Sequence, residues 1–282
     1  MLQLGIFTKV FSQPTLGAVL DAVAATGLRC VQFNMESAGL PVMPEVIADD
    51  EAARIYNETE KRGITIGSVQ GTFNMSHPDA DFRRAGLRRL RTMAEACPRL
   101  GTRKIAICIG TRDPDDMWRH HPENDSPTAW RDMCQCVGEA VEIAEQSDVT
   151  LALEPEVNNI VDSAQAARRL LDEIGSPRLR ITMDAANLFH AGKLPRMAEV
   201  LDEAFALLGK DIVLAHAKDL SRDGDAGHEA AGKGRLDYGR YLSLLRECGF
   251  EGPLLLHGLA ESQVAGCVAF LREMLSRPTP AA

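Results

Sequence analysis

The sequence predicts an α/β protein with a single domain, in which eight parallel strands and eight helices alternate and close into a (β/α)8 barrel. Three observations lead to this prediction. Short apolar runs alternate with helical patterns eight times along the chain. The length of 282 residues is large for an ordinary domain but usual for such a barrel. No linker or shift in composition marks a domain boundary, so the barrel is expected to span residues 1–276.

Apolar runs that are short and often β-branched predict the strands. They cover residues 2–10, 30–34, 64–70, 104–109, 150–153, 179–183, 212–217 and 253–256. Amphipathic patterns predict the helices over residues 15–26, 44–62, 79–100, 128–147, 163–174, 194–208, 237–248 and 261–276. Gly27 and Gly63 are expected to end the first two helices. Residues 277–282, which include two prolines, are expected to form a flexible C-terminal tail.

Four consecutive predicted strands end in residues that could bind a metal. Glu154 and Asp184 follow the fifth and sixth strands, His216 ends the seventh and His257 follows the eighth. The carboxyl ends of barrel strands meet on one face, which carries the chemistry, so these side chains are expected to share a site. Two carboxylates and two imidazoles favour one divalent metal, Mn²⁺ or Zn²⁺ first and Fe²⁺ or Co²⁺ next, over Mg²⁺ or Ca²⁺. The alternative is a set of unrelated polar residues at a solvated rim.

Charge and composition exclude several partners. The net charge of −9 argues against affinity for nucleic acid or for an anionic membrane surface. No apolar run is long enough to cross a membrane. Seven scattered cysteines without a signal peptide indicate the reducing cytoplasm, and their spacing disfavours a cysteine-based metal site.

Six segments, spread in order over nearly the whole chain, carry a family resemblance. They read LGIFTKVF, VAATGLRCVQF, LALEPE, ITMDAANL, LAHAKD and GKGRLDY. Together they resemble the xylose-isomerase-like TIM barrel superfamily of sugar and sugar-phosphate isomerases and epimerases. The resemblance implies a divalent metal held by Glu, Asp, His and Glu from strands five to eight. The first three positions fall on Glu154, Asp184 and His216, whereas His257 replaces the fourth glutamate. Relatives often pair, so a homodimer is an open expectation.

The resemblance implies a metal-dependent isomerase or epimerase that acts on a small sugar, polyol or sugar phosphate through an enediolate. In the related ketose epimerases the glutamates of strands five and eight also move protons, which makes Glu154 and His257 the catalytic candidates. A metal-bound imidazole nitrogen has no free lone pair, so His257 cannot bind the metal and take a proton with the same atom. A metal-dependent lyase resembling an inosose dehydratase is therefore the alternative. An endonuclease-like phosphodiesterase and a non-catalytic sugar-binding barrel are less favoured.

Polar residues close to the predicted strand ends are candidates for contact with the substrate. They are His77, Glu156, Asn187, Lys218 and Arg235. Glu156 is expected to point to the same side as Glu154, because side chains of an extended chain alternate. The competing interpretations are a structural loop histidine for His77, a loop cap for Asn187 and solvated cations for Lys218 and Arg235. The long segment 110–127 is either a lid or a subunit contact.

Overall fold

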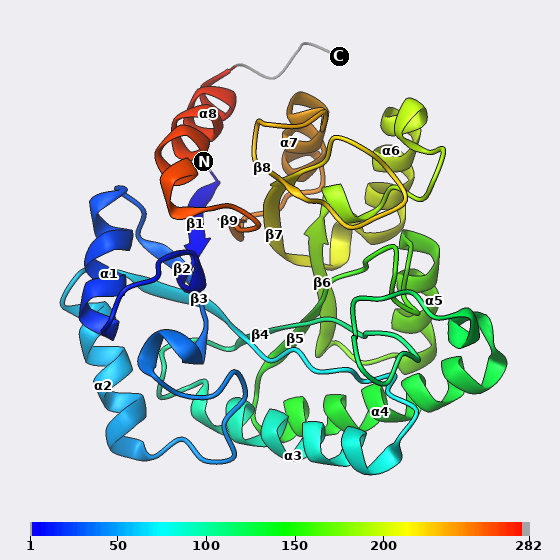
Figure 1. The fold of residues 1–282 in the computed structure, drawn as a ribbon, viewed down its shortest axis with the longest axis horizontal. Coiled ribbons are helices and arrows are strands. Elements are labelled where there is room, and N and C mark those ends of the chain that lie inside the picture. The colour runs from blue at the N-terminus through cyan, green and yellow to red at the C-terminus, as the bar shows by residue number, and fades with distance from the viewer. Residues whose placement is uncertain (1, 278–282) are drawn as a thin grey trace.

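The structure, a computed structural model, describes residues 2–277 and confirms the closed parallel barrel (Figure 1). The barrel strands are β1 (Gln3–Phe7), β2 (Cys30–Phe33), β3 (Thr65–Gln70), β4 (Lys104–Ile107), β5 (Thr150–Leu153), β6 (Leu179–Asp184), β7 (Ile212–Asp219) and β9 (Pro253–Leu256). Neighbouring strands pair in parallel, and pairing of β1 with β9, β9 with β7 and β7 with β6 closes the ring. The eighth barrel strand of the sequence analysis is therefore β9.

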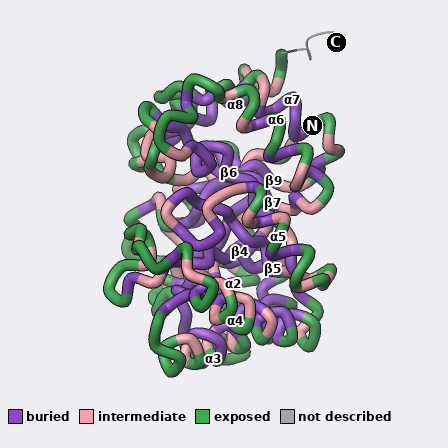
Figure 2. The backbone as a smooth tube through the Cα atoms, turned by 90° about the vertical axis from the view of Figure 1, so that its right-hand side faces the viewer, coloured by how far each residue is buried: buried purple, intermediate pink, exposed green. Residues whose placement is uncertain are grey.

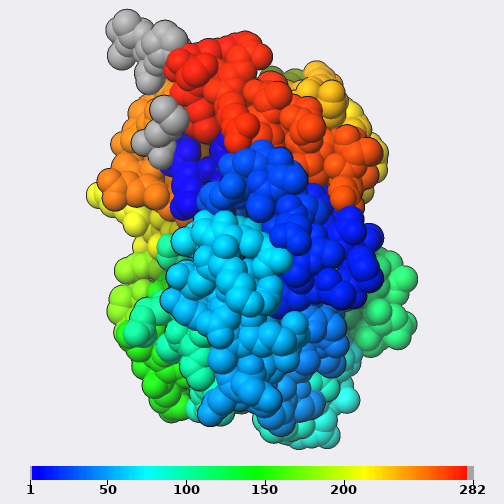
Figure 3. Space-filling view, turned by 90° about the vertical axis from the view of Figure 1, so that its left-hand side faces the viewer, coloured from blue at the N-terminus to red at the C-terminus, as the bar shows by residue number. Residues whose placement is uncertain are grey.

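Within residues 2–277, eight α-helices surround the strands in the order of the chain (Figure 1). They are α1 (Leu16–Ala25), α2 (Asp49–Glu60), α3 (Ala80–Ala96), α4 (Pro127–Gln146), α5 (Ala164–Ile174), α6 (Met197–Leu208), α7 (Tyr238–Glu247) and α8 (Val264–Ser276). The N-terminal part of the chain, in dark blue, and the C-terminal part, in red, lie side by side on the face seen in Figure 3, as closure of the barrel requires. No helix within residues 2–277 is both long and apolar enough to cross a membrane.

Several boundaries differ from the sequence prediction. The first strand ends at Phe7, because the Thr8 hydroxyl accepts the backbone N–H of Asn34 at 2.9 Å and the chain turns into a short 3-10 helix. Helix α2 begins at Asp49, after a loop that occupies the predicted first turn. The turns predicted to begin the sixth and eighth helices are short 3-10 helices in the structure. Most of the predicted tail, residues 278–282, lies outside the described residues.

Strand β7 is two residues longer than predicted and pairs with a short antiparallel strand, β8 (Glu229–Ala230), in the loop that follows it. The sequence analysis predicted no strand or helix between residues 217 and 237. The pairing continues β7 through Lys218 and Asp219, both of which are buried. Asp219 also accepts the backbone N–H groups of Leu236 at 2.8 Å and Gly232 at 3.1 Å, so it holds the loop against the barrel.

Alternation along the strands decides which side chains point into the barrel. Buried residues concentrate at the strands, whereas exposed residues concentrate on the outside (Figure 2). A small apolar cluster, separate from the main core, consists of Phe7, Cys30, Ala106, Ala152, Leu214 and Leu255. Three of its members precede Glu154, His216 and His257 by two residues. Side chains two positions apart on a strand point to the same side. Glu154, His216 and His257 therefore point toward the barrel axis at its carboxyl end.

Candidate metal centre

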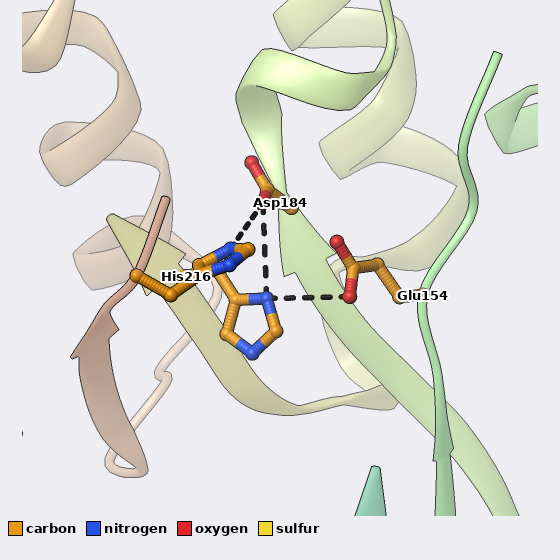
Figure 4. A group of neighbouring side chains, drawn as sticks. Glu154, Asp184 and His216 are labelled. Carbon is orange, nitrogen blue, oxygen red and sulfur yellow. Dashed lines mark hydrogen bonds and ion pairs between the residues drawn. The ribbon is translucent and has the colours of Figure 1, made fainter. Parts of the chain in front are cut away.

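Parallel pairing brings Glu154, Asp184, His216 and His257 to one place. Each offers one ligand atom, and the four atoms lie within 4.8 Å of one another. Asp184 and His216 are register partners on β6 and β7. Figure 4 shows Glu154, Asp184 and His216 directed toward a common point. The structure therefore brings together the four residues that the sequence analysis expected to share a site.

A buried nitrogen without a partner lies at the centre of the cluster. His216 Nδ1 is 3.4 Å from Glu154 Oε2 and 3.7 Å from Asp184 Oδ2, yet no residue between 2 and 277 forms a hydrogen bond with it. Buried polar atoms are normally satisfied, and unsatisfied ones call for an explanation. Once it has lost its proton, an imidazole nitrogen that lies beside two carboxylates completes the kind of donor set that a divalent transition metal takes. The residues present therefore fit a metal ion.

Gln32 favours one tautomer of His216. Its Oε1 lies 3.4 Å from His216 Nε2 and also accepts the hydroxyl of Ser68 at 3.1 Å. An amide oxygen can only accept, so this contact favours the tautomer with the proton on Nε2. The lone pair of the neutral ring is then on Nδ1, the nitrogen that faces the carboxylates. Such support is typical of metal-binding histidines. Sequence analysis missed Gln32, although a glutamine in an otherwise apolar strand was a usable signal.

Asp184 is the most connected carboxylate of the cluster. Its Oδ2 is 2.9 Å from His257 Nε2 and 3.2 Å from Lys218 Nζ, while Oδ1 accepts the backbone N–H of Ala186 at 3.1 Å. Burial disfavours the charged form, but Lys218 and the two histidines hold the pKa of Asp184 well below its usual range. The carboxylate is thus ionised and ready to bind a cation.

The pKa values of the two histidines are shifted in opposite directions. Burial opposes the charge of His216, but the carboxylates of Glu154 and Asp184 raise its pKa to about 9. Burial, together with Lys218 and His216, lowers the pKa of His257 to about 4. His257 is therefore neutral near pH 7, the form that binds metals, and its ring stacks on Phe7 with centroids 4.5 Å apart. His216 must release its proton before it can bind a metal.

A cavity of about 190 Å³ opens beside the cluster. Its lining includes Phe7, Gln32, Cys108, Trp118, Glu154, Glu156, Asn187, Lys218 and His257. Burial and the charge of Glu154 raise the pKa of Glu156 to about 7, despite the hydrogen bond from the backbone of Asn158. Glu156, Asn187 and Lys218, three of the five predicted substrate contacts, thus lie at the cavity. Trp118 reaches it from the segment 110–127.

Two predicted contacts do not reach this cavity. His77 Nδ1 accepts the backbone N–H of Asp79 at 3.0 Å, and Nε2 is 3.1 Å from the carbonyl oxygen of Pro114. Both ring nitrogens therefore contact the backbone, as expected for a structural loop histidine, the competing interpretation of His77. Arg235 is exposed and does not line the cavity. Cys108, which sequence analysis also missed, lies with Sγ 3.7 Å from Glu154 Oε2.

Similar solved structures cover almost the full chain. An L-ribulose 3-epimerase shares 16% sequence identity with a TM-score of 0.77, over 98% of this chain and 95% of that one. A xylose isomerase-like TIM barrel protein from Mycobacterium smegmatis in complex with magnesium shares 15%, with a TM-score of 0.73 over 98% and 97%. The probable 3-DHS dehydratase AsbF from Bacillus anthracis shares 14%, with a TM-score of 0.73 over 96% and 99%. At these identities the likeness concerns the fold.

No curated protein sequence matches the chain. The sequence pattern of one family, described as the xylose isomerase-like TIM barrel, matches residues 20–273. This match covers most of the chain, including every strand end that contributes to the cluster, and it agrees with the barrel found in the structure. The chain therefore belongs to the xylose isomerase-like TIM barrel family.

Proposed function

We propose that the protein is a divalent-metal-dependent isomerase or epimerase of a small sugar, polyol or sugar phosphate. The observation that carries the proposal is His216 Nδ1, a buried nitrogen that faces Glu154 and Asp184 beside a cavity and has no hydrogen-bond partner among the described residues. The family and its epimerase neighbours support this class of reaction.

The proposed ligands are Glu154, Asp184, His216 and His257. Two nitrogen and two carboxylate donors favour Mn²⁺ or Zn²⁺, with Fe²⁺ or Co²⁺ next, although one structural neighbour contains magnesium. A divalent ion supplies Lewis-acid polarisation of a substrate carbonyl when it is bound.

The remaining roles fall to residues at the cavity. Glu154 is the proposed base that takes a proton from the carbon beside the carbonyl. His257, which follows β9, is the second proposed catalytic residue. Glu156 and Lys218, which line the cavity, are the proposed contacts for substrate hydroxyl groups, and the second amide hydrogen of Asn187 is proposed for the same purpose. The cavity has room for a small ligand, and the apolar rings of Phe7 and Trp118 form part of its wall.

A lyase on the same scaffold is the second candidate. Two observations favour it: a dehydratase is among the structural neighbours, and β9 presents His257 rather than a glutamate. Elimination of water needs one base and assistance to the leaving group, so it tolerates the absence of a second glutamate.

Exchange of substrate hydrogen for solvent deuterium tests the proposal. Metal-loaded protein, incubated with a panel of ketoses, keto-polyols and their phosphates in D₂O, is expected to incorporate deuterium beside the carbonyl of at least one compound. Loss of water from the substrate would select the lyase. Glu154→Gln should abolish exchange, while Glu251→Gln, an exposed change before β9, is the matched control. No exchange and no dehydration over the panel would contradict both candidates.

We also propose a cytoplasmic location, supported by seven free cysteines. The proposed partner is a small sugar-like molecule rather than nucleic acid or membrane, given the net charge of −9. A homodimer is proposed from the family resemblance alone, and sedimentation of the purified protein tests it.

A further inference from the structure

The two glutamates that follow β5 are held in the same way by asparagines. Glu154 Oε1 accepts a hydrogen bond from Asn187 Nδ2 at 2.6 Å, and Glu156 Oε2 accepts one from Asn159 Nδ2 at 2.6 Å. Both asparagines are only 2% exposed. Each therefore acts on its carboxylate from inside the protein.

The orientation of the Asn187 amide is fixed by a backbone group. Its Oδ1 accepts the N–H of Gly227 at 2.9 Å. Because a backbone N–H can only donate, the oxygen must face Gly227 and the amide nitrogen must face Glu154. Rotation of the amide by half a turn would place donor against donor and oxygen against carboxylate. Asn159 has the same arrangement, with its Oδ1 on the N–H of Gly110 at 2.6 Å.

The anchor at Gly227 is itself held in place. It lies in the loop between β7 and β8, where the N–H of Gly224 donates to the carbonyl oxygen of Phe189 at 2.8 Å. Asp223 Oδ2, in the same loop, accepts the N–H of Leu194 at 2.8 Å. These bonds fasten the loop to the segment after β6, which also carries Asn187.

We infer that Asn187 is a positioning residue that orients Glu154 for metal binding without touching the ion. With Oε1 held by Asn187, the other oxygen, Oε2, faces His216 Nδ1 at 3.4 Å. The last torsion of a glutamate is soft, so a free carboxylate would sample other directions. A fixed carboxylate avoids that cost when the ion binds. This inference rests on the proposed metal site and revises Asn187 from a substrate contact to a support of Glu154.

Asn159 provides a matched control. Its clamp holds Glu156, which is outside the cluster of four ligand residues. Asn187→Ala and Asn159→Ala remove the same groups from equally buried positions, but only the first frees a proposed ligand. The difference between the two variants therefore reports on orientation of Glu154 rather than on loss of a buried amide.

Titration with Co²⁺, followed by calorimetry and by visible absorption, tests the inference. Asn187→Ala is expected to weaken Co²⁺ binding by about 10–100-fold and to change the absorption spectrum. Asn159→Ala is expected to keep the wild-type affinity and spectrum. If wild-type protein binds Co²⁺ and Asn187→Ala matches it in both readouts, the positioning role is wrong and the proposed function stands. If wild-type protein binds no Co²⁺, both fail.

Hydrogen exchange of the wild-type protein gives a second test that needs no variant. Because binding and clamping are linked, Co²⁺ is expected to slow exchange of the Gly227 N–H. The Gly110 N–H, which is bonded to Asn159, is the internal control and should exchange at an unchanged rate. Equal exchange of Gly227 with Co²⁺ and with EDTA, in protein that binds Co²⁺, would overturn the inference.

Discussion

Asp184→Asn removes one charge from the centre of the cluster and leaves Lys218 without its nearest counter-charge. The Asp184 side chain is 0% exposed, that of Lys218 is 8% exposed, and Nζ lies 3.2 Å from Oδ2. Removal of one partner from a buried ion pair costs about 3–5 kcal/mol, because the other charge remains buried. Asp184→Asn is therefore expected to lower the free energy of unfolding by about 3–5 kcal/mol in the absence of metal.

Lys218→Met and the double variant complete the cycle. Lys218→Met should cost less, since Asp184 keeps its hydrogen bonds from His257 and the backbone of Ala186. The double variant has neither charge and should be more stable than Asp184→Asn alone. Urea unfolding in EDTA, followed by circular dichroism, measures all four proteins. A cost below about 1 kcal/mol for Asp184→Asn, the range of an exposed pair, would refute the argument from burial.

Three further predictions concern the site and its support. Because His216 has a pKa of about 9 without metal, binding at pH 7 should release its proton, and affinity should rise about tenfold per pH unit up to that pKa. Calorimetry in buffers of different ionisation enthalpy counts that proton, and a count of zero would contradict the assignment. His257→Glu should retain the metal but shift its preference from Zn²⁺ toward Mg²⁺, measured by competition; unchanged preference would place His257 outside the site. Gly227→Ala places a Cβ 2.6 Å from that of Ala186 and should cost about 1–3 kcal/mol, whereas Gly138→Ala meets nothing within 4 Å and should not destabilise; equal unfolding midpoints would argue against this packing.

The cluster was predictable because it depends on strand ends. Parallel strands bring their carboxyl ends to one edge, so Glu154, Asp184, His216 and His257 could be placed together without coordinates. The strands themselves carry a clear apolar pattern, and the order of strands and helices followed from it.

Loop side chains could not be placed from their position along the chain. Glu154 comes directly after β5, whereas His77 lies seven residues beyond the end of β3, and its ring turns to the backbone of Asp79 and Pro114. Asn187 depends on Gly227, forty residues further along the chain, so its partner is set by tertiary structure. The strand pair that extends β7 also depends on the path of its loop.

Metal content is the most direct test of the account. Purified protein, stripped with chelator and titrated with Mn²⁺, Zn²⁺, Fe²⁺ or Co²⁺, is expected to bind one ion per chain by elemental analysis after gel filtration. His216→Ala, which removes the unpartnered Nδ1, should bind none under the same conditions. A wild-type protein that retains none of these ions, or a His216→Ala variant that retains one as tightly as the wild type, would contradict the metal site on which the proposed function depends.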